Sequence, residues 1–241
     1  MTMAIGLGEK LEWDSAFFGV PVGQGQVETP VEVEAVDAWA EREGIRCVYL
    51  LVPAGRFAAT QAAEARGFFQ TGFRVTCACE APFKVETAGG ADGVVIRPVC
   101  PSDVHELKRI AANSHSDTRF YADGHFPRAS CDRLYETWIE RSCEGWADQV
   151  LVAERDGLHG YISLHVRPNG QGTIGLFAVA SHARRMGIGR ALVQSALDWF
   201  AGRNVRRVNV ATQAQNIAAL HLYQRAGFMV SRVDLWLHKW R

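Results

Sequence analysis

The sequence predicts a mixed α/β fold built on a mixed sheet, and three observations indicate it. Apolar residues make up 48% of the chain and charged residues 22%, as in average soluble globular proteins, so a core of ordinary size can form. Short β-branched or alternating runs predict strands, and apolar residues at helical spacing predict helices. In the second part of the chain, a run of consecutive strands is followed by the order strand, helix, strand. This combination gives a mixed sheet.

The Gly-rich run TAGGADG at residues 87–93 divides the chain, because small residues of this kind suit a flexible linker. We therefore predict a smaller N-terminal α/β domain over residues 1–88 and a second domain over residues 89–241. The length of 241 residues exceeds the roughly 100–200 residues of one average domain, which is consistent with two domains.

In the first domain, residues 47–52 predict a strand, residues 57–66 a helix and residues 69–79 a strand or hairpin. The end of this segment, ARGFFQTGFRVTCACE, is similar to the end of the chain, RAGFMVSRVDLWLHK. Both run from a helix end through Gly-Phe into an alternating strand, and Gly suits the left-handed position past a helix C-terminus. A degenerate internal repeat and a chance likeness of a common pattern explain the similarity equally well.

In the second domain, the strand VVIRPV precedes a helix that Pro101-Ser102-Asp103 opens and that runs to about residue 114, and Asp156-Gly157 is a strong hairpin signal between two strands. The other elements are predicted as a helix at 130–144, strands at 149–154, 158–166 and 172–179, a helix at 188–203, a strand at 207–212, a helix at 216–225 and a closing strand at 228–238.

Composition argues against several classes of protein. Lys plus Arg (26) balance Asp plus Glu (26), so neither nucleic acid nor a membrane surface is an expected partner. No run approaches the ~18 apolar residues of a membrane helix, and the N-terminus lacks the apolar stretch of a signal peptide. The six cysteines are scattered without a C-x-x-C pair, so we expect free thiols, a reducing cytoplasm and no metal site.

The segment VASHARRMGIGRAL (179–192) carries the main chemical signal, because it joins a predicted strand to an amphipathic helix. Gly187 and Gly189 permit close approach of a ligand to the backbone. The first N–H groups of a helix have no internal partner and carry partial positive charge, so a diphosphate fits there. Arg184, Arg185 and Arg190 would add local cations.

Other interpretations of this glycine pattern fit less well. A nucleotide P-loop requires Lys followed by Ser or Thr after its last glycine, but Arg190 and Ala191 follow here. A dinucleotide fingerprint requires a third Gly or Ala where Leu192 stands. A helix start with glycines kept only for packing remains as the structural alternative.

Residues 184–191 resemble the R/Q-x-x-G-x-G/A motif of the GCN5-related N-acetyltransferases, and residues 94–241 follow that family's order of elements. The resemblance implies the acyl-CoA N-acyltransferase fold, acetyl-CoA as cosubstrate, and a first domain that is a candidate degenerate half of the same fold. It implies a splayed strand that pairs with the pantetheine arm, through Leu176, Phe177, Ala178 and Val179. It also implies cofactor contacts from Arg184, Arg185, Met186, Gly187, Ile188, Gly189, Arg190 and Ala191, with the amides of Arg185, Gly187, Gly189 and Arg190 on the pyrophosphate.

Asn216 and Tyr223 form a second pair. Seven residues differ by roughly 20° from two helical turns, so both side chains share a face of the predicted helix. The resemblance implies that Asn216 contacts the cofactor and that Tyr223 is catalytic, protonating the departing thiolate. A phenol with a pKa near 10 is a competent acid for this step. Packing of Tyr223 beside Leu220 and Phe228 is the structural alternative.

The sequence nominates no base for the amine. Glu154, His165 and Asp123 are polar positions that could reach the site directly or through water, and each has a structural alternative. Catalysis that rests chiefly on proximity and orientation would need no strong base.

A narrower resemblance indicates the acceptor. Residues 11–24, 114–142 and 211–228 resemble the dTDP-fucosamine acetyltransferases of enterobacterial common antigen synthesis, although the sequence departs from them at Asp123-Gly124-His125. The resemblance implies acetylation of the 4-amino group of a nucleotide-linked 4-amino-4,6-dideoxy sugar. Arg119, Phe120, Tyr121 and His125 are the candidate substrate-binding residues, and the two cationic groups suit a diphosphate. A protein N-terminus or another small-molecule amine as acceptor, a CoA-binding module without turnover, and a homodimer stay open.

Overall fold

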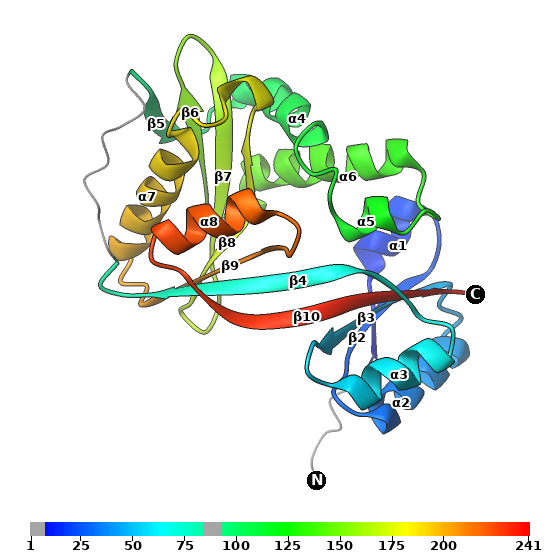
Figure 1. The fold of residues 1–241 in the computed structure, drawn as a ribbon. Coiled ribbons are helices and arrows are strands. Elements are labelled where there is room, and N and C mark those ends of the chain that lie inside the picture. Colours follow the sequence, from blue (N-terminus) through cyan, green and yellow to red (C-terminus); the bar gives the residue numbers. More distant parts are fainter. Residues whose placement is uncertain (1–7, 84–92) are drawn as a thin grey trace. The chain divides into compact units, whose positions relative to one another are not determined.

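The computed structural model describes residues 8–83 and 93–241, which form two compact units (Figure 1). Unit 1 combines Met1–Arg74, Thr118–Phe126 and Arg232–Arg241, whereas unit 2 combines Val75–Asp117 and Pro127–Ser231. The boundary predicted between residues 88 and 89 lies outside the described residues. The division into domains 1–88 and 89–241 therefore stays a prediction.

Unit 1 is built on strands in the order β1 (Gly8–Lys10), β2 (Val22–Gln26), β3 (Cys47–Pro53), β10 (Met229–Trp240) and β4 (Phe69–Glu80). Strand β2 runs parallel to β3, and β10 runs antiparallel to it with Leu50 opposite Leu237 and Tyr49 opposite His238. Because successive side chains point to opposite faces, the two pairs belong to different faces of the sheet.

Two helices cover the face that carries Leu50 and Leu237, namely α2 (Pro30–Arg42) and α3 (Phe57–Ala65) (Figure 1). Helix α2 begins with a capping box, in which the Thr29 hydroxyl accepts from the Glu32 N–H while the Glu32 carboxylate accepts from the Thr29 N–H. The opposite face carries aromatic residues of α1 (Glu12–Phe18) and α5 (Arg119–Ala122), with the rings of Phe18 and Phe120 in tilted contact at 5.8 Å between centroids.

Unit 2 places its strands in the order β4, β9 (Arg207–Gln213), β8 (Gly172–Val179), β7 (Leu158–Val166), β6 (Gln149–Glu154) and β5 (Val95–Pro98). Neighbours from β5 to β8 are antiparallel, and β8 and β9 are parallel. Helix α7 (Ile188–Ala201) covers one face, where a Cβ on Gly160 would lie 3.2 Å from Leu192. Helices α4 (Val104–Ala112) and α6 (Arg128–Arg141) cover the other, and α8 (Ile217–Arg225) follows β9 (Figure 1).

The predicted mixed α/β class is confirmed. Strands β6, β7 and β8 have the predicted bounds, whereas β1, β2, α1, α2 and α5 were not predicted. The six cysteines are free thiols, as expected, and four are buried. None of the helices in the described ranges combines the length and the apolar character required to cross a membrane.

The two similar sequence ends close their helices in the same way. Gly67 and Gly227 have φ values of 84° and 88°, in the left-handed region. The following Phe68 N–H donates to Ala63 O at 3.1 Å, and Phe228 N–H donates to Tyr223 O at 2.9 Å. This shared geometry accounts for the Gly-Phe pair in both segments, and the internal repeat itself stays a prediction.

Candidate functional site

The parallel strands β8 and β9 separate part-way along their length. The residues paired across these strands are Gly172–Val208, Thr173–Asn209 and Ile174–Val210. Beyond Ile174 and Val210 no further pair forms between the two strands, both of which the structure describes in full. Strand β8 nevertheless continues to Val179 and β9 to Gln213. The backbone groups that Leu176, Phe177, Ala178 and Val179 direct toward β9 therefore have no registered partner there and can pair with an extended ligand.

A β-bulge starts this separation. Phe177 pairs with Ile162 and Ile174 pairs with Leu164, so β8 contains one residue more than β7 between the two pairs. The unpaired Leu176 N–H donates to Ser163 Oγ at 2.7 Å. A Cβ at Gly175 would lie 2.7 Å from both Ser163 Oγ and His165 Nε2, so a larger residue would displace these side chains or the bulge.

The loop after β8 turns its backbone nitrogens toward the start of α7. Arg185 and Gly187 adopt left-handed φ values of 65° and 80°, and α7 begins at Ile188. The first helical hydrogen bond is from Ala191 N to Gly187 O, and the nitrogens of Arg185, Gly187 and Gly189 have no backbone acceptor among the described residues. Unbonded N–H groups at a helix N-terminus form an anion site, and a diphosphate fits it.

The side chains of the predicted phosphate segment have different environments. Arg184, Arg185, Met186 and Arg190 are exposed, and the side chain of Arg184 also donates to Val179 O at 3.3 Å. Ile188 is 1% exposed, so its side chain belongs to the core and only its backbone can serve a ligand. Ala191 is half-buried in the first turn of α7.

Helix α8 brings Tyr223 to the separated strands. The Phe177 and Tyr223 ring centroids are 6.2 Å apart, and a Cβ at Gly189 would lie 3.3 Å from both Phe177 and Leu222. The residues of β8, α7 and α8 therefore converge. Tyr223 is 3% exposed, its hydroxyl has no hydrogen-bond partner among the described residues, and burial raises the pKa of the phenol. It also packs on Phe228, as the structural alternative requires.

Asn216 caps α8 instead of lying within it. Its side-chain oxygen accepts from Ala219 N at 3.2 Å, which satisfies one of the free N–H groups of the first turn. A cofactor contact from Asn216 stays a prediction.

The three polar residues that could act as the base differ in their hydrogen bonds, burial and position. Glu154 accepts from Arg97 Nε at 2.6 Å, which lowers the pKa of the Glu154 carboxyl. Asp123 belongs to unit 1, is 3% exposed and accepts from the Trp240 indole at 3.0 Å. His165 is half-buried beside Gly175, and burial lowers its pKa below the usual 6.5. Of these three, only His165 lies next to the bulge in β8.

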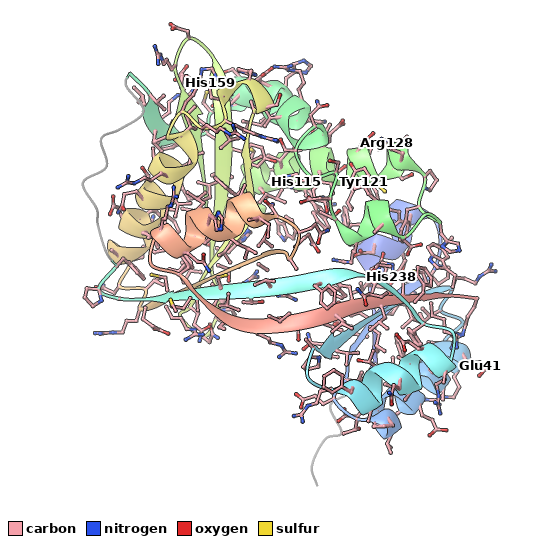
Figure 2. The ribbon with its side chains drawn as sticks, viewed as in Figure 1. Glu41, His115, Tyr121, Arg128, His159 and His238 are labelled. Atoms are coloured by element: carbon pink, nitrogen blue, oxygen red, sulfur yellow. The ribbon has the colours of Figure 1, made fainter. Side chains whose placement is uncertain are left out.

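A second half-buried histidine of unit 2 has no signal in the sequence. His115 follows α4, its Nε2 lies 3.1 Å from the Tyr161 hydroxyl, and its ring stacks on Tyr135 at 4.5 Å (Figure 2). Burial lowers the pKa of His115 to about 4. Tyr161 pairs with Ala178 of β8, so this dyad lies on the strand beside the separation. His115 and Tyr161 are 46 positions apart in the sequence, so no local pattern reveals their contact.

The four predicted substrate-binding residues all belong to unit 1. Phe120 is 1% exposed and packs on Tyr49 and Phe126, so it supports α5 from within the core. The His125 side chain is 54% exposed, with Nδ1 2.8 Å from Asp123 Oδ1. Arg119 and Tyr121 are partly exposed on α5.

Known proteins similar to this chain agree with this geometry. The model of the acetyltransferase (GNAT) family matches residues 109–228. A dTDP-fucosamine acetyltransferase of Escherichia coli O6:H1 is 29% identical over 235 residues, covering 96% of this chain and 97% of that protein. The spore coat polysaccharide biosynthesis protein SpsD of Bacillus subtilis is 25% identical over 144 residues, and the match covers 59% of this chain and half of SpsD.

Among solved structures, a GCN5-related N-acetyltransferase from Sphaerobacter thermophilus has a TM-score of 0.69 at 19% identity, covering 97% of this chain and 76% of that one. This likeness concerns the fold. The family match spans α6, the separated strands, the phosphate loop and α8. The chain therefore belongs to the acetyltransferase (GNAT) family and is an acetyl-transferring enzyme.

Proposed function

We propose that the enzyme transfers acetyl from acetyl-CoA to the 4-amino group of a nucleotide-linked amino-dideoxy sugar. The separation of β8 and β9, leading into the phosphate loop and flanked by Tyr223, is the observation that carries the cofactor half of this proposal. The acceptor half is supported by the relative that matches 97% of its own length and is named a dTDP-fucosamine acetyltransferase.

The chain fits CoA in a definite direction. The N–H groups of Arg185, Gly187 and Gly189 suit the diphosphate, and the exposed arginines beside them add charge. The open edge of β8 then leads back from Val179 to Leu176, about 10 Å at roughly 3.3 Å per residue, and suits the pantetheine arm. In this proposed direction the thioester would lie beside Gly175, where β8 and β9 come together.

Acetyl-CoA supplies an activated acetyl group when bound. The amine nitrogen forms the new bond to the carbonyl carbon, the carbon–sulfur bond breaks, and the sulfur leaves as a thiolate. Tyr223 gives that thiolate its phenolic proton and afterwards recovers a proton from solvent, because burial raises the pKa of the phenol and the phenolate cannot persist at neutral pH. The products are the N-acetylated sugar and CoA with a free thiol.

His165 is assigned as the group that accepts the amine proton, directly or through one water. Its Nε2 lies 2.7 Å from the position that a Cβ of residue 175 would take, at the proposed thioester end of the open strand. Its lowered pKa keeps the ring neutral at neutral pH, so a lone pair is available. Glu154, paired to Arg97, and the buried Asp123 do not combine these properties.

The decisive test is thiol release from acetyl-CoA with a panel of amines. The panel contains a dTDP-linked 4-amino-4,6-dideoxy sugar, its 3-amino isomer, the free amino sugar, an aminoglycoside and a peptide with a free N-terminus. We expect the 4-amino nucleotide sugar to give the highest kcat/KM, with the acetyl group found on N4. Turnover of the peptide or the aminoglycoside alone would refute the sugar acceptor, and turnover with another acyl-CoA alone would refute the acetyl donor.

A further inference from the structure

The polar loop that follows α4, residues 113–117, contacts both sides of the opening between β8 and β9 within unit 2. His115 Nε2 lies 3.1 Å from the hydroxyl of Tyr161, which is paired with the open part of β8. On the other side, Gln215 Nε2 donates to Asp117 O at 2.7 Å, and Gln215 follows the end of β9. The loop therefore connects the two strands where they are no longer paired with each other.

The loop lies on the face of the sheet that α7 does not cover. A Cβ on Gly160 would lie 3.2 Å from a leucine of α7, so Tyr161, the next residue, faces the opposite side. Phe177 pairs with Ile162 and therefore shares the face of Gly160. The Tyr223 ring lies 6.2 Å from that of Phe177. The phosphate loop and the proposed acid thus occupy the α7 side of the opening, which leaves the side of the loop for the amine.

Two tyrosines of unit 2 fix the His115 ring. The ring stacks on Tyr135 of α6 with 4.5 Å between centroids and an interplanar angle of 20°, while Nε2 meets the Tyr161 hydroxyl (Figure 2). Tyr135 is 4% exposed and Tyr161 is fully buried, so close packing holds both in place. A ring that is held on one face and at one nitrogen has its orientation set before any ligand binds.

The second nitrogen of this ring is available to a ligand. Nδ1 of His115 makes no hydrogen bond to any residue that the structure describes. The residue is half-buried, and Nδ1 is not among the enclosed nitrogens, so it can be reached from outside. A group that is already ordered loses little freedom when it forms a hydrogen bond to a ligand, which favours binding.

The chemistry of the ring suits a hydroxyl group. Burial lowers the pKa of His115 to about 4, so the imidazole carries no charge at neutral pH that would attract an anion. A neutral imidazole donates from one nitrogen and accepts at the other. The Tyr161 hydroxyl can take either role, so Nδ1 is a donor in one tautomer and an acceptor in the other. A sugar hydroxyl matches both tautomers, because it donates and accepts.

We propose that His115 binds the acceptor through a hydrogen bond between Nδ1 and a hydroxyl group beside the reacting amine. Tyr161 and Tyr135 are positioning residues, and the bond from Gln215 to Asp117 holds the loop across the opening. The choice of the 3-hydroxyl of a nucleotide-linked 4-amino sugar rests on the proposed function, whereas the contact of His115 with a hydroxylated acceptor does not.

Steady-state kinetics by thiol release, together with calorimetry of CoA binding, test this contact. His115→Phe keeps a ring to stack on Tyr135 but loses both nitrogens, and Tyr161→Phe loses only the hydroxyl that orients the ring. Ser116→Ala is the matched control, because Ser116 is an exposed neighbour in the same loop. We expect KM for the nucleotide sugar to rise about tenfold in His115→Phe and about threefold in Tyr161→Phe, and to stay unchanged in Ser116→Ala. The Kd for CoA should stay the same in all three variants.

An acceptor analogue identifies the hydroxyl group. The 3-deoxy form of the nucleotide sugar should have a KM about tenfold higher with the natural enzyme. His115→Phe should raise that KM no further, because the analogue has already lost the partner of Nδ1. A purely structural role for His115 would raise the KM of both acceptors by the same factor and would overturn the proposal.

Two further outcomes would overturn the contact. One is an unchanged KM for the nucleotide sugar in His115→Phe, and the other is a Kd for CoA that rises together with that KM. If His115→Phe does not fold, Tyr161→Phe decides the question, because its effect on KM should disappear with the 3-deoxy analogue.

The acceptor panel separates this contact from the proposed function. If an aminoglycoside is the acceptor and its KM rises in His115→Phe, the proposed function fails and the contact of His115 with a hydroxylated amine stands. Turnover of the nucleotide sugar with an unchanged KM in His115→Phe would give the opposite result.

Discussion

The Leu176 N–H donates to Ser163 Oγ at 2.7 Å, so a side chain of β7 satisfies a backbone group that β8 leaves unpaired at its bulge. This bond stabilises the extra residue in β8 and thereby the edge that opens toward β9. Because the bond depends on close approach between the two strands, the size of residue 175 controls the geometry of the whole edge.

Gly175→Ala should therefore impair cofactor binding. Its Cβ would lie 2.7 Å from Ser163 Oγ and His165 Nε2, so the bulge or both side chains must move. We expect KM for acetyl-CoA to rise about tenfold or more, measured by thiol release. Gly55→Ala is the control, because its Cβ meets no atom within 4 Å and its kinetics should match the natural enzyme. An unchanged KM in Gly175→Ala would contradict the role of this edge.

Tyr223→Phe should lower kcat roughly 10²-fold or more, the usual scale for loss of a general acid, with little change in KM for acetyl-CoA. Burial raises the pKa of Tyr223, so the natural enzyme should keep its protonated acid and show no loss of activity from this residue below pH 10. A kcat in Tyr223→Phe equal to that of the natural enzyme from pH 6 to 10 would show that the ring only packs the core.

His165→Gln tests the proton acceptor through the acidic limb of the pH profile. The ring accepts a proton only while neutral, and its pKa lies below 6.5, so kcat/KM should fall as the pH drops through that lowered value. We expect the glutamine variant to lose about tenfold or more in kcat and to lack this limb. His105→Gln, a change at an exposed histidine of α4, serves as the control. An acidic limb that persists in His165→Gln would assign it to another group.

His115 should make the fold sensitive to acid. Its pKa is about 4 in the folded chain and about 6.5 when unfolded, so the unfolded state binds the proton more readily between these values. This contribution to stability is complete above pH 6.5 and is lost as the pH falls toward 4. The slope approaches about 1.4 kcal/mol per pH unit for one proton, and urea titrations at several pH values should show it reduced in His115→Gln. Equal slopes in both proteins would contradict a lowered pKa in the fold.

The elements that the sequence predicted well have strong local signals. Asp156 and Gly157 take left-handed φ values of 51° and 132°, and the hairpin they form fixes the neighbouring ends of β6 and β7. The phosphate loop was predictable for the same reason, because Gly187 and the start of α7 are encoded within a few residues. Local conformation of this kind depends on residue type alone.

The elements that were missed are short or depend on distant residues. Helix α5 has four residues and α1 has no buried residue, so neither shows an apolar period. The bulge at Gly175 requires Ser163 and His165 on the next strand, and no pattern within β8 reveals them. Helix α2, in contrast, could have been predicted from the sequence, because Thr29 and Glu32 have the spacing of a capping box.

The position of β10 in unit 1 has a consequence for synthesis. Strand β3 pairs with β10 from Pro53 opposite Asp234 to Cys47 opposite Trp240, so β3 is translated before helices α3 to α8 and its partner strand only after them. Pairing between such distant segments is slow to form. During synthesis, the apolar residues of β3 therefore lack one partner strand until β10 has been made. A chain truncated before residue 232 should expose these residues to aggregation and to chaperones.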